Sequence, residues 1–183
     1  MIALLASLAH AQPTAALDAG FPWSQLSATL PLTERLSLAA QYRTALLIRH
    51  LPAAGLDALL IDQKWLLIGH LRAGWLLQTG TLASSGPTAA ARLTLERSGR
   101  VFPTASAGVR GIGLLSQTVT VTADDTTTLT DLTPALSILG TLGVGWQTTE
   151  QVRLDVRLTI DQVEIPGFSI PGIGAGITYR GLP

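Results

Sequence analysis

The chain has 183 residues but no cysteine, a single methionine and only 13% charged residues. The absence of cysteine excludes a disulfide-stapled fold, a thiolate metal site and a cysteine nucleophile. Charged residues make up about 25% of an ordinary soluble domain, so this chain has about half of the usual charge. Twelve basic side chains balance twelve acidic ones, and this balance argues against nucleic acid as a partner.

Long uninterrupted apolar runs are also missing, although 47% of the residues are hydrophobic and the mean hydropathy is +0.39. A membrane-spanning helix needs about 20 apolar residues in a row. The two best windows, 44–61 and 65–77, are interrupted by Arg49 and Pro52 and by Arg72. The sequence therefore does not predict a membrane-spanning helix.

The first eleven residues, MIALLASLAHA, form a separate apolar segment. The segment ends in Ala-His-Ala, which matches the A-x-A pattern of a signal-peptide cleavage site, but it lacks the usual basic start. We predict a signal peptide at 1–11 and a single exported domain at 12–183, since one domain is the natural count at this length. The alternative is that residues 1–11 form an apolar N-terminal strand or helix.

Apolar and polar residues alternate along much of the chain after residue 23, most clearly over 152–160. There the apolar face holds Val152, Leu154, Val156, Leu158 and Ile160, and the polar face holds Arg153, Asp155, Arg157 and Thr159. A period of two places each set on one face of a strand. The same period runs through 24–30, 35–49, 65–79, 89–96, 105–121, 136–146 and 173–180.

The short turns between these segments indicate antiparallel strands that are joined as an up-and-down meander. We therefore predict an all-β fold of about eight strands. Residues 50–64 do not follow the alternation clearly. Two interpretations of this segment stay open: a loop with a helical turn, or a strand at 56–62 that adds to its neighbour.

The polar face of the strands differs in composition from the charged surface of a soluble sheet. The chain has a single lysine, Lys64, and its polar face consists mainly of glycine, serine and threonine with arginine and a few carboxylates. This composition suits a crowded interior in which guanidinium forks bind carboxylates. We therefore predict an up-and-down antiparallel transmembrane β-barrel with a polar interior and an apolar exterior.

Charged residues on the polar face are predicted to line the barrel lumen. An eight-stranded barrel is only wide enough for side chains to fill, so we expect Arg–carboxylate pairs, such as Arg153 or Arg157 with Glu96, to plug it. Any residual conductance should then favour anions. The predicted lumen-lining charged residues are Arg35, Arg43, Arg72, Arg92, Glu96, Arg110, Arg153, Asp155, Arg157 and Asp161.

Aromatic residues near strand ends suggest a girdle. Trp65 and Trp75 share one face of a strand and are ten residues apart. At about 3.3 Å per residue and a tilt near 40°, this separation spans roughly 25 Å, the height of the apolar band of a membrane barrel. We predict that Trp65, Trp75, Trp146 and Tyr179 lie at the membrane interfaces. The alternative is that the two tryptophans are core anchors.

The last strand, Gly-Ile-Gly-Ala-Gly-Ile-Thr-Tyr-Arg at 172–180, alternates apolar residues with glycine and closes on Tyr179. With this strand and the alternation over 24–180, the chain resembles the small outer-membrane β-barrels of the OmpA/OmpX-like type, which have about eight strands. The resemblance implies a monomer in the outer membrane of a Gram-negative cell envelope. It also implies the lipid bilayer as a partner and contact with the barrel-assembly machinery through the C-terminal strand.

Motifs for catalysis are missing from the sequence. The chain has three histidines and no H-E-x-x-H, G-x-S-x-G or phosphate-binding motif, so we predict a non-enzymatic protein without metal or cofactor. Its role would be structural or adhesive, or that of a narrow porin-like pore. The alternative is a soluble periplasmic or secreted β-barrel or sandwich that binds an apolar ligand in a cavity lined by leucine and valine.

Overall fold

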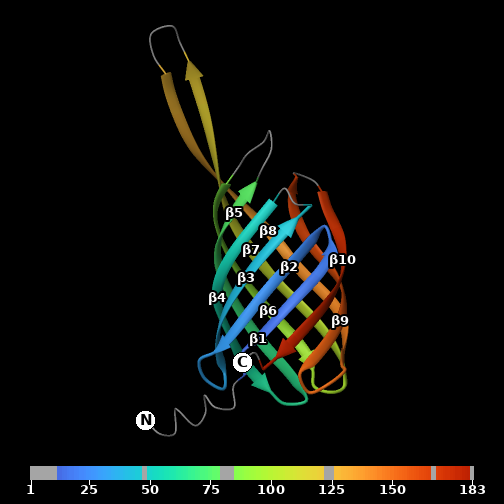
Figure 1. Ribbon diagram of the computed structural model, residues 1–183. Coiled ribbons are helices and arrows are strands. Elements are labelled where there is room, and N and C mark those ends of the chain that lie inside the picture. Colours follow the sequence, from blue (N-terminus) through green and yellow to red (C-terminus); the bar gives the residue numbers. More distant parts are fainter. Residues whose placement is uncertain (1–11, 47–48, 79–84, 122–125, 166–167, 182–183) are drawn as a thin grey trace, which may run out of the picture.

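The computed structural model describes residues 12–46, 49–78, 85–121, 126–165 and 168–181, and over these ranges ten antiparallel strands close into a barrel (Figure 1). Side chains are described except at 116–121, 126–130, 161–165 and 168–170. The segment 1–11, predicted to be a signal peptide, lies outside the described residues. No helix in the described ranges is long and apolar enough to cross a membrane.

Each strand pairs with its neighbours in the chain until β1 closes against β10. At this closure Thr14 lies opposite Arg180 and Phe21 opposite Ile173. The strands are β1 (Thr14–Phe21), β2 (Trp23–Pro31), β3 (Leu36–Ala45), β4 (Arg49–Asp62), β5 (Trp65–Gln78), β6 (Ser85–Arg97), β7 (Val101–Val121), β8 (Thr126–Gln147), β9 (Val152–Ile165) and β10 (Phe168–Arg180).

The predicted all-β up-and-down barrel is confirmed, but the strand number of about eight is too low because β1 and β4 were not recognised as strands. β1 reads TAALDAGF and β4 reads RHLPAAGLDALLID, so alanine stands on both faces and the polarity contrast is small. Pro52 also argues against a central strand, because proline cannot donate to the hydrogen-bond ladder. Residues 49–62 nevertheless pair with both β3 and β5.

The two ends of the barrel differ. β1 starts and β10 finishes at the lower rim in Figure 1, and the turns at 32–35, 63–64, 98–100 and 148–151 lie at the same rim, here called the turn end. Thr33 and Thr149 stabilise two of these turns, since each hydroxyl accepts hydrogen bonds from backbone N–H groups two and three residues later. At the opposite rim, the arm end, β7 and β8 continue beyond the barrel as a two-stranded arm (Figure 1).

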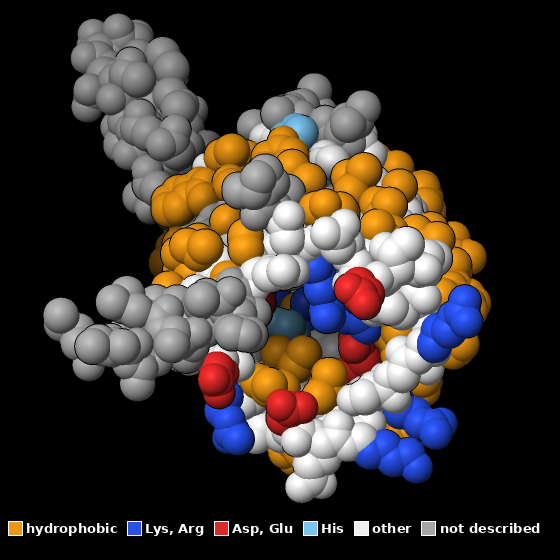
Figure 2. All heavy atoms as spheres, turned by 60° about the horizontal axis from the view of Figure 1, so that its bottom comes forward, with side chains coloured by type: hydrophobic (Ala, Val, Ile, Leu, Met, Phe, Trp, Pro, Cys, Tyr) orange, Lys and Arg blue, Asp and Glu red, His pale blue; other side chains and the backbone are white. Residues whose placement is uncertain are grey.

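Among the described side chains of the barrel wall, lumen and exterior positions alternate along the strands. The alternation is interrupted at a register shift in β4 between Leu59 and Ile61, where Leu60 and Ile61 are both exposed. The exterior carries large apolar side chains, such as Leu142, which is 65% exposed, whereas Arg110 points inward and is 5% exposed. Figure 2 shows the turn end, with hydrophobic side chains around the outside and charged side chains inside the opening. The strands therefore have an apolar exterior and a lumen that contains most of the charge of the barrel wall.

Candidate functional site in the barrel lumen

An ion pair crosses the lumen between β9 and β6. The guanidinium of Arg153 on β9 contacts the carboxylate of Glu96 on β6. The same guanidinium lies over the ring of Phe102, with its Cζ atom 3.8 Å from the ring centroid. Of the two partners suggested by the sequence for Glu96, the structure places Arg153 in contact with it and not Arg157. Contacts with both an anion and an aromatic face hold this arginine in one orientation.

Arg157 is held at the seam where β1 and β10 close the barrel. Its Nη2 atom donates to Asp18 Oδ1 at 2.8 Å, and its Nε atom donates to Asp155 Oδ2 at 2.5 Å. Asp18, Gly176 and Asp155 form one row across β1, β10 and β9. Because Gly176 has no side chain, the two carboxylates and the guanidinium share the space above it; we call these three side chains the seam cluster. The sequence did not suggest Asp18, because β1 was not recognised.

A second network joins β4, β5 and β6. Asp57 accepts from Arg72 Nη2 at 2.5 Å and lies 2.7 Å from His70 Nδ1. The other ring nitrogen of His70, Nε2, lies 2.9 Å from the hydroxyl of Thr94. With Nδ1 protonated toward the carboxylate, Nε2 accepts from the hydroxyl, so both ring nitrogens have partners. Asp57 lies in the segment for which the sequence left two interpretations open, and it was therefore missed as a lumen residue.

Four arginines converge near the middle of the lumen. Arg43, Arg72, Arg92 and Arg110 line one small void of about 30 Å³, and we call them the central arginine cluster. They come from β3, β5, β6 and β7. The guanidinium of Arg43 lies 4.7 Å from the ring centroid of Trp23, whose indole is inside the barrel. The lumen therefore holds a concentrated positive charge at this level.

An apolar layer fills part of the lumen toward the arm end. Leu51, Leu76 and Ile112 are buried against one another, and Leu114 packs on them. These four side chains, here called the apolar plug, point inward from β4, β5 and β7. The sequence offers a signal for this layer: Leu76, Ile112 and Leu114 stand on the otherwise polar sides of their strands. At this level the lumen is packed like a small hydrophobic core.

The lumen opens at the turn end into a cavity of about 660 Å³, here called the vestibule (Figure 2). One wall is apolar and consists of Leu59, Leu66 and Ile68, while Arg35 and Arg180 lie at the mouth. Asp57 and His70 line its deeper part. A second cavity of about 210 Å³ borders His70 and reaches Arg92 and Arg153. The charged network is thus in contact with space that opens at one end of the barrel.

The remaining predicted residues fall into three places. Arg35 is exposed at the mouth of the vestibule, and the side chain of Asp161 lies outside the described residues. The four predicted girdle residues point outward and are 37–43% exposed; they are Trp65, Trp75, Trp146 and Tyr179. All except Trp75 stand at the turn end of their strands. In the described part of the chain, no group of three or more histidine, aspartate or glutamate side chains is placed to hold a metal ion.

No protein-family model and no curated protein matches the chain. Among solved structures, it is similar to the N-terminal β-barrel domain of Pseudomonas aeruginosa OprF, with 11% identity, a TM-score of 0.41 and coverage of 92% of this chain and 95% of that one. It is also similar to outer membrane phospholipase A from Escherichia coli (13% identity, TM-score 0.40, 97% of each chain) and to Acinetobacter baumannii Omp33 (7% identity, TM-score 0.44, 93% of this chain and 98% of that one). These values are too low to carry a function across.

The substitution Gly176→Ala is expected to disturb the seam cluster. The added Cβ would overlap Asp18 Oδ1 and lie within 2.5 Å of Asp155 Oδ1, so one carboxylate has to leave Arg157. We expect the free energy of unfolding, measured by urea titration of the refolded barrel in vesicles, to fall by about 1–3 kcal/mol. Gly111→Ala is the matched control, because the nearest atom to its added Cβ is 3.9 Å away. Equal losses in both variants would contradict the assignment.

Proposed function

We propose that the chain is a non-enzymatic, monomeric β-barrel of the outer membrane in a Gram-negative cell envelope. Its lumen is closed to free diffusion, and its role is structural or adhesive. The observation that carries the proposal is the polarity of the wall: large apolar side chains cover the outside and arginines with their carboxylates occupy the inside. In water this arrangement exposes far more contiguous apolar surface than a soluble monomer tolerates.

A bilayer accounts for the outer face. Lipid-facing barrels carry an apolar band about 25 Å tall between two aromatic girdles. Trp65 and Trp75 stand ten residues apart on the outside of β5, one near each end of the strand. Trp146 and Tyr179 add outward aromatic rings at the turn end. Indole and phenol rings favour the interface because one edge is apolar and the other polar.

The connectivity supports one orientation in the membrane. Outer-membrane barrels of a single chain have an even number of strands, short turns on the periplasmic side and longer excursions outside. The turn end carries the first and last strand ends, so it would face the periplasm, and the β7–β8 arm would face the medium. In this orientation the arm would make any adhesive contact outside the cell. Strand β10 would make the contact with the assembly machinery on the periplasmic side.

The soluble alternative requires the opposite orientation of the strands. A carrier of apolar ligands lines its cavity with leucine and valine and turns arginine to water. Here Leu154, Val156 and Leu158 point outward, and the inward positions between them hold Asp155 and Arg157. The inward leucines of the apolar plug are packed against one another and against Ile112.

Thiol labelling at two neighbouring positions of β9 tests the membrane placement. Arg153→Cys faces the lumen cavity and Leu154→Cys faces outward, and the chain has no other cysteine. In isolated outer membranes we expect a water-soluble maleimide to label position 153 faster than position 154, because lipid covers the latter. Faster labelling at position 154 would show that water reaches the apolar face and would overturn the proposal.

Planar-bilayer recording tests closure of the lumen. The wild-type barrel is expected to conduct poorly, with any residual current carried by anions because of the central arginine cluster. The double variant Leu51→Ala and Leu76→Ala removes much of the apolar plug and should raise the conductance. Leu77→Ala, on the exterior of the same strand, is the control and should leave it unchanged. Large cation-selective steps from the wild type would contradict a closed, positively charged lumen.

An esterase assay tests the non-enzymatic part of the proposal. Thr94, His70 and Asp57 follow the order hydroxyl, imidazole and carboxylate that nucleophilic hydrolases use. Here Asp57 is shared with Arg72, which supports a structural network. We expect nitrophenyl esters of short and long chain length to be hydrolysed no faster by the wild type than by His70→Gln. Hydrolysis that depends on both His70 and Thr94 would instead establish an enzyme.

A further inference from the structure

We propose that the lumen binds a small inorganic oxyanion, of the sulfate or phosphate type, beside Arg92. The site is a cavity of about 70 Å³ into which Arg43, Arg92 and Arg157 project. These arginines belong to β3, β6 and β9, which lie apart around the barrel wall. The inference depends on the geometry of the lumen and does not depend on the placement of the barrel in a membrane.

Arg92 is the lumen arginine that has no anionic partner among the described residues. Among the described residues it makes no hydrogen bond, and no carboxylate lies within the 4.0 Å distance of an ion pair. The described carboxylates of the lumen are all bound to other cations. They are Asp18 and Asp155 with Arg157, Asp57 with Arg72 and His70, and Glu96 with Arg153.

The positively charged surroundings of Arg92 make the binding of an anion beside it more favourable. The positive charges of Arg43, Arg72 and Arg157 repel Arg92, and Asp57, which attracts it, is already bound to Arg72 and His70. Arg92 also shares the small void of about 30 Å³ with the rest of the central arginine cluster. Burying a guanidinium without a partner costs several kcal/mol, so an anion in the adjoining cavity would stabilise the folded barrel.

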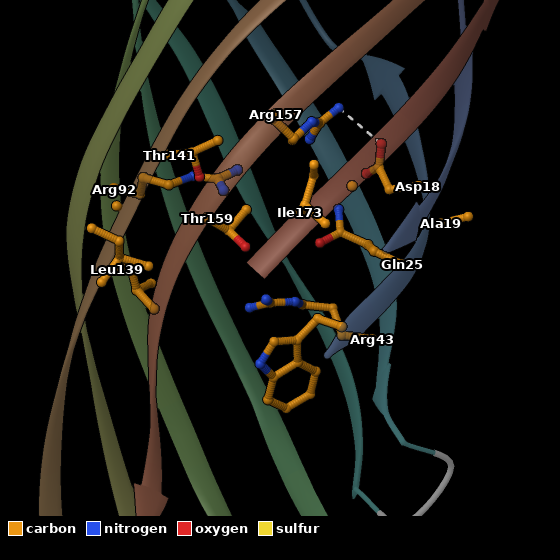
Figure 3. Close-up of a pocket in the computed structure, with 14 residues that line it drawn as sticks. Asp18, Ala19, Gln25, Arg43, Arg92, Leu139, Thr141, Arg157, Thr159 and Ile173 are labelled. Atoms are coloured by element: carbon orange, nitrogen blue, oxygen red, sulfur yellow. Dashed lines mark hydrogen bonds and ion pairs between the residues drawn. The ribbon is translucent and has the colours of Figure 1, made fainter. Parts of the chain in front are cut away.

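The donors around the cavity suit an oxyanion. Figure 3 shows Arg92 and Arg43 entering the cavity from different walls, with the amide of Gln25 and the hydroxyls of Thr141 and Thr159 nearby. Guanidinium forks pair with two oxygens of one group, which a tetrahedral oxyanion offers in several directions. A halide has a single acceptor atom, so it cannot offer a separate oxygen to each N–H of a fork as an oxyanion does.

The carboxylate that lines the same cavity does not oppose the anion directly. Asp18 is turned toward Arg157, whose Nη2 atom lies 2.8 Å from Oδ1 (Figure 3). Its charge is therefore engaged at the seam, on the side of the cavity away from Arg92 in this view. The guanidinium of Arg92 remains the principal group that faces the space without a partner among the described residues.

Trp23 provides a direct measurement. Its indole lines the cavity and stacks under Arg43 at 4.7 Å, whereas the other tryptophans, at positions 65, 75 and 146, point outward. Replacing these three with phenylalanine leaves Trp23 as the single tryptophan emitter. Sodium sulfate and sodium phosphate are titrated into the detergent-solubilised barrel at constant ionic strength against chloride. We expect a saturable change in the Trp23 emission with either oxyanion.

Substitutions identify the residue responsible. In the same background, Arg92→Gln should abolish the saturable change, and Arg92→Lys should weaken binding about tenfold or more, since it loses the fork while keeping the charge. Arg97→Gln, an exposed arginine at the turn end of the same strand, should bind as the parent does. Heat-modifiable migration on a detergent gel verifies that each variant is folded.

Three outcomes would overturn the proposal. The first is the absence of a saturable change in emission when either oxyanion replaces chloride at constant ionic strength. The second is binding that persists unchanged in both Arg92 variants. The third is loss of binding in Arg97→Gln to the same degree, which would mean a diffuse surface effect.

Discussion

The guanidinium of Arg157 lies where the first and last strands of the chain pair with each other. It binds Asp18 on β1 and Asp155 on β9, and Gly176 on β10 stands between these two carboxylates in the same row. A barrel closes only if its terminal strands pair in one register. A slip of one residue would turn Asp18 to the exterior and Leu17 into the lumen. Buried ion pairs contribute little net stability, but they penalise alternatives that leave a charge unpaired. The seam cluster therefore acts mainly by selecting the register of closure.

The need to pair inward-facing charges also determines how side chains are arranged in the rest of the lumen. Each inward charge needs a partner on the lumen face, because its immediate neighbours along the strand point outward. The partner lies two residues away on the same strand, as for Arg157 and Asp155, or on another strand, as for Asp57 and Arg72. Where carboxylates are available, arginines pair with them, as Arg153 does with Glu96. Nearer the arm end the inward residues of β4, β5 and β7 become Leu51, Leu76 and Ile112. The lumen thus has charged side chains and open cavities toward the turn end, and an apolar layer toward the arm end.

Much of this arrangement could be predicted from the alternation of residues, and its failures have physical causes. In segments such as 152–160 one face is apolar and the other is polar. A period of two therefore predicts the strand, and it also predicts that Arg153 points into the lumen and Leu154 to the exterior. β1 and β4 contain alanine on both faces, which is compatible with lipid and with a crowded lumen alike. Their lumen carboxylates, Asp18 and Asp57, were missed for that reason.

The contacts between side chains across the lumen could not be predicted from the alternation of residues. β6 and β9 are not neighbours in the sheet, so alternation shows that Glu96 and Arg153 both face inward but not that they meet. The partner of each arginine depends on strand number, tilt and register around the whole ring. This is why Glu96 had two suggested partners, and why Arg157 instead binds the two carboxylates of the seam.

The strand number also determines the chemistry of the interior. An eight-stranded barrel has a lumen that its own side chains just fill, and in such a space every inward arginine would be packed against protein. Two further strands increase the circumference, and the described lumen accordingly contains separate cavities between its charged layers. Arg92 borders three of the lumen cavities, of about 30, 70 and 210 Å³. The wider barrel thus leaves open space beside Arg92, which has no carboxylate partner among the described residues. We therefore expect the lumen to hold small solutes as well as side chains.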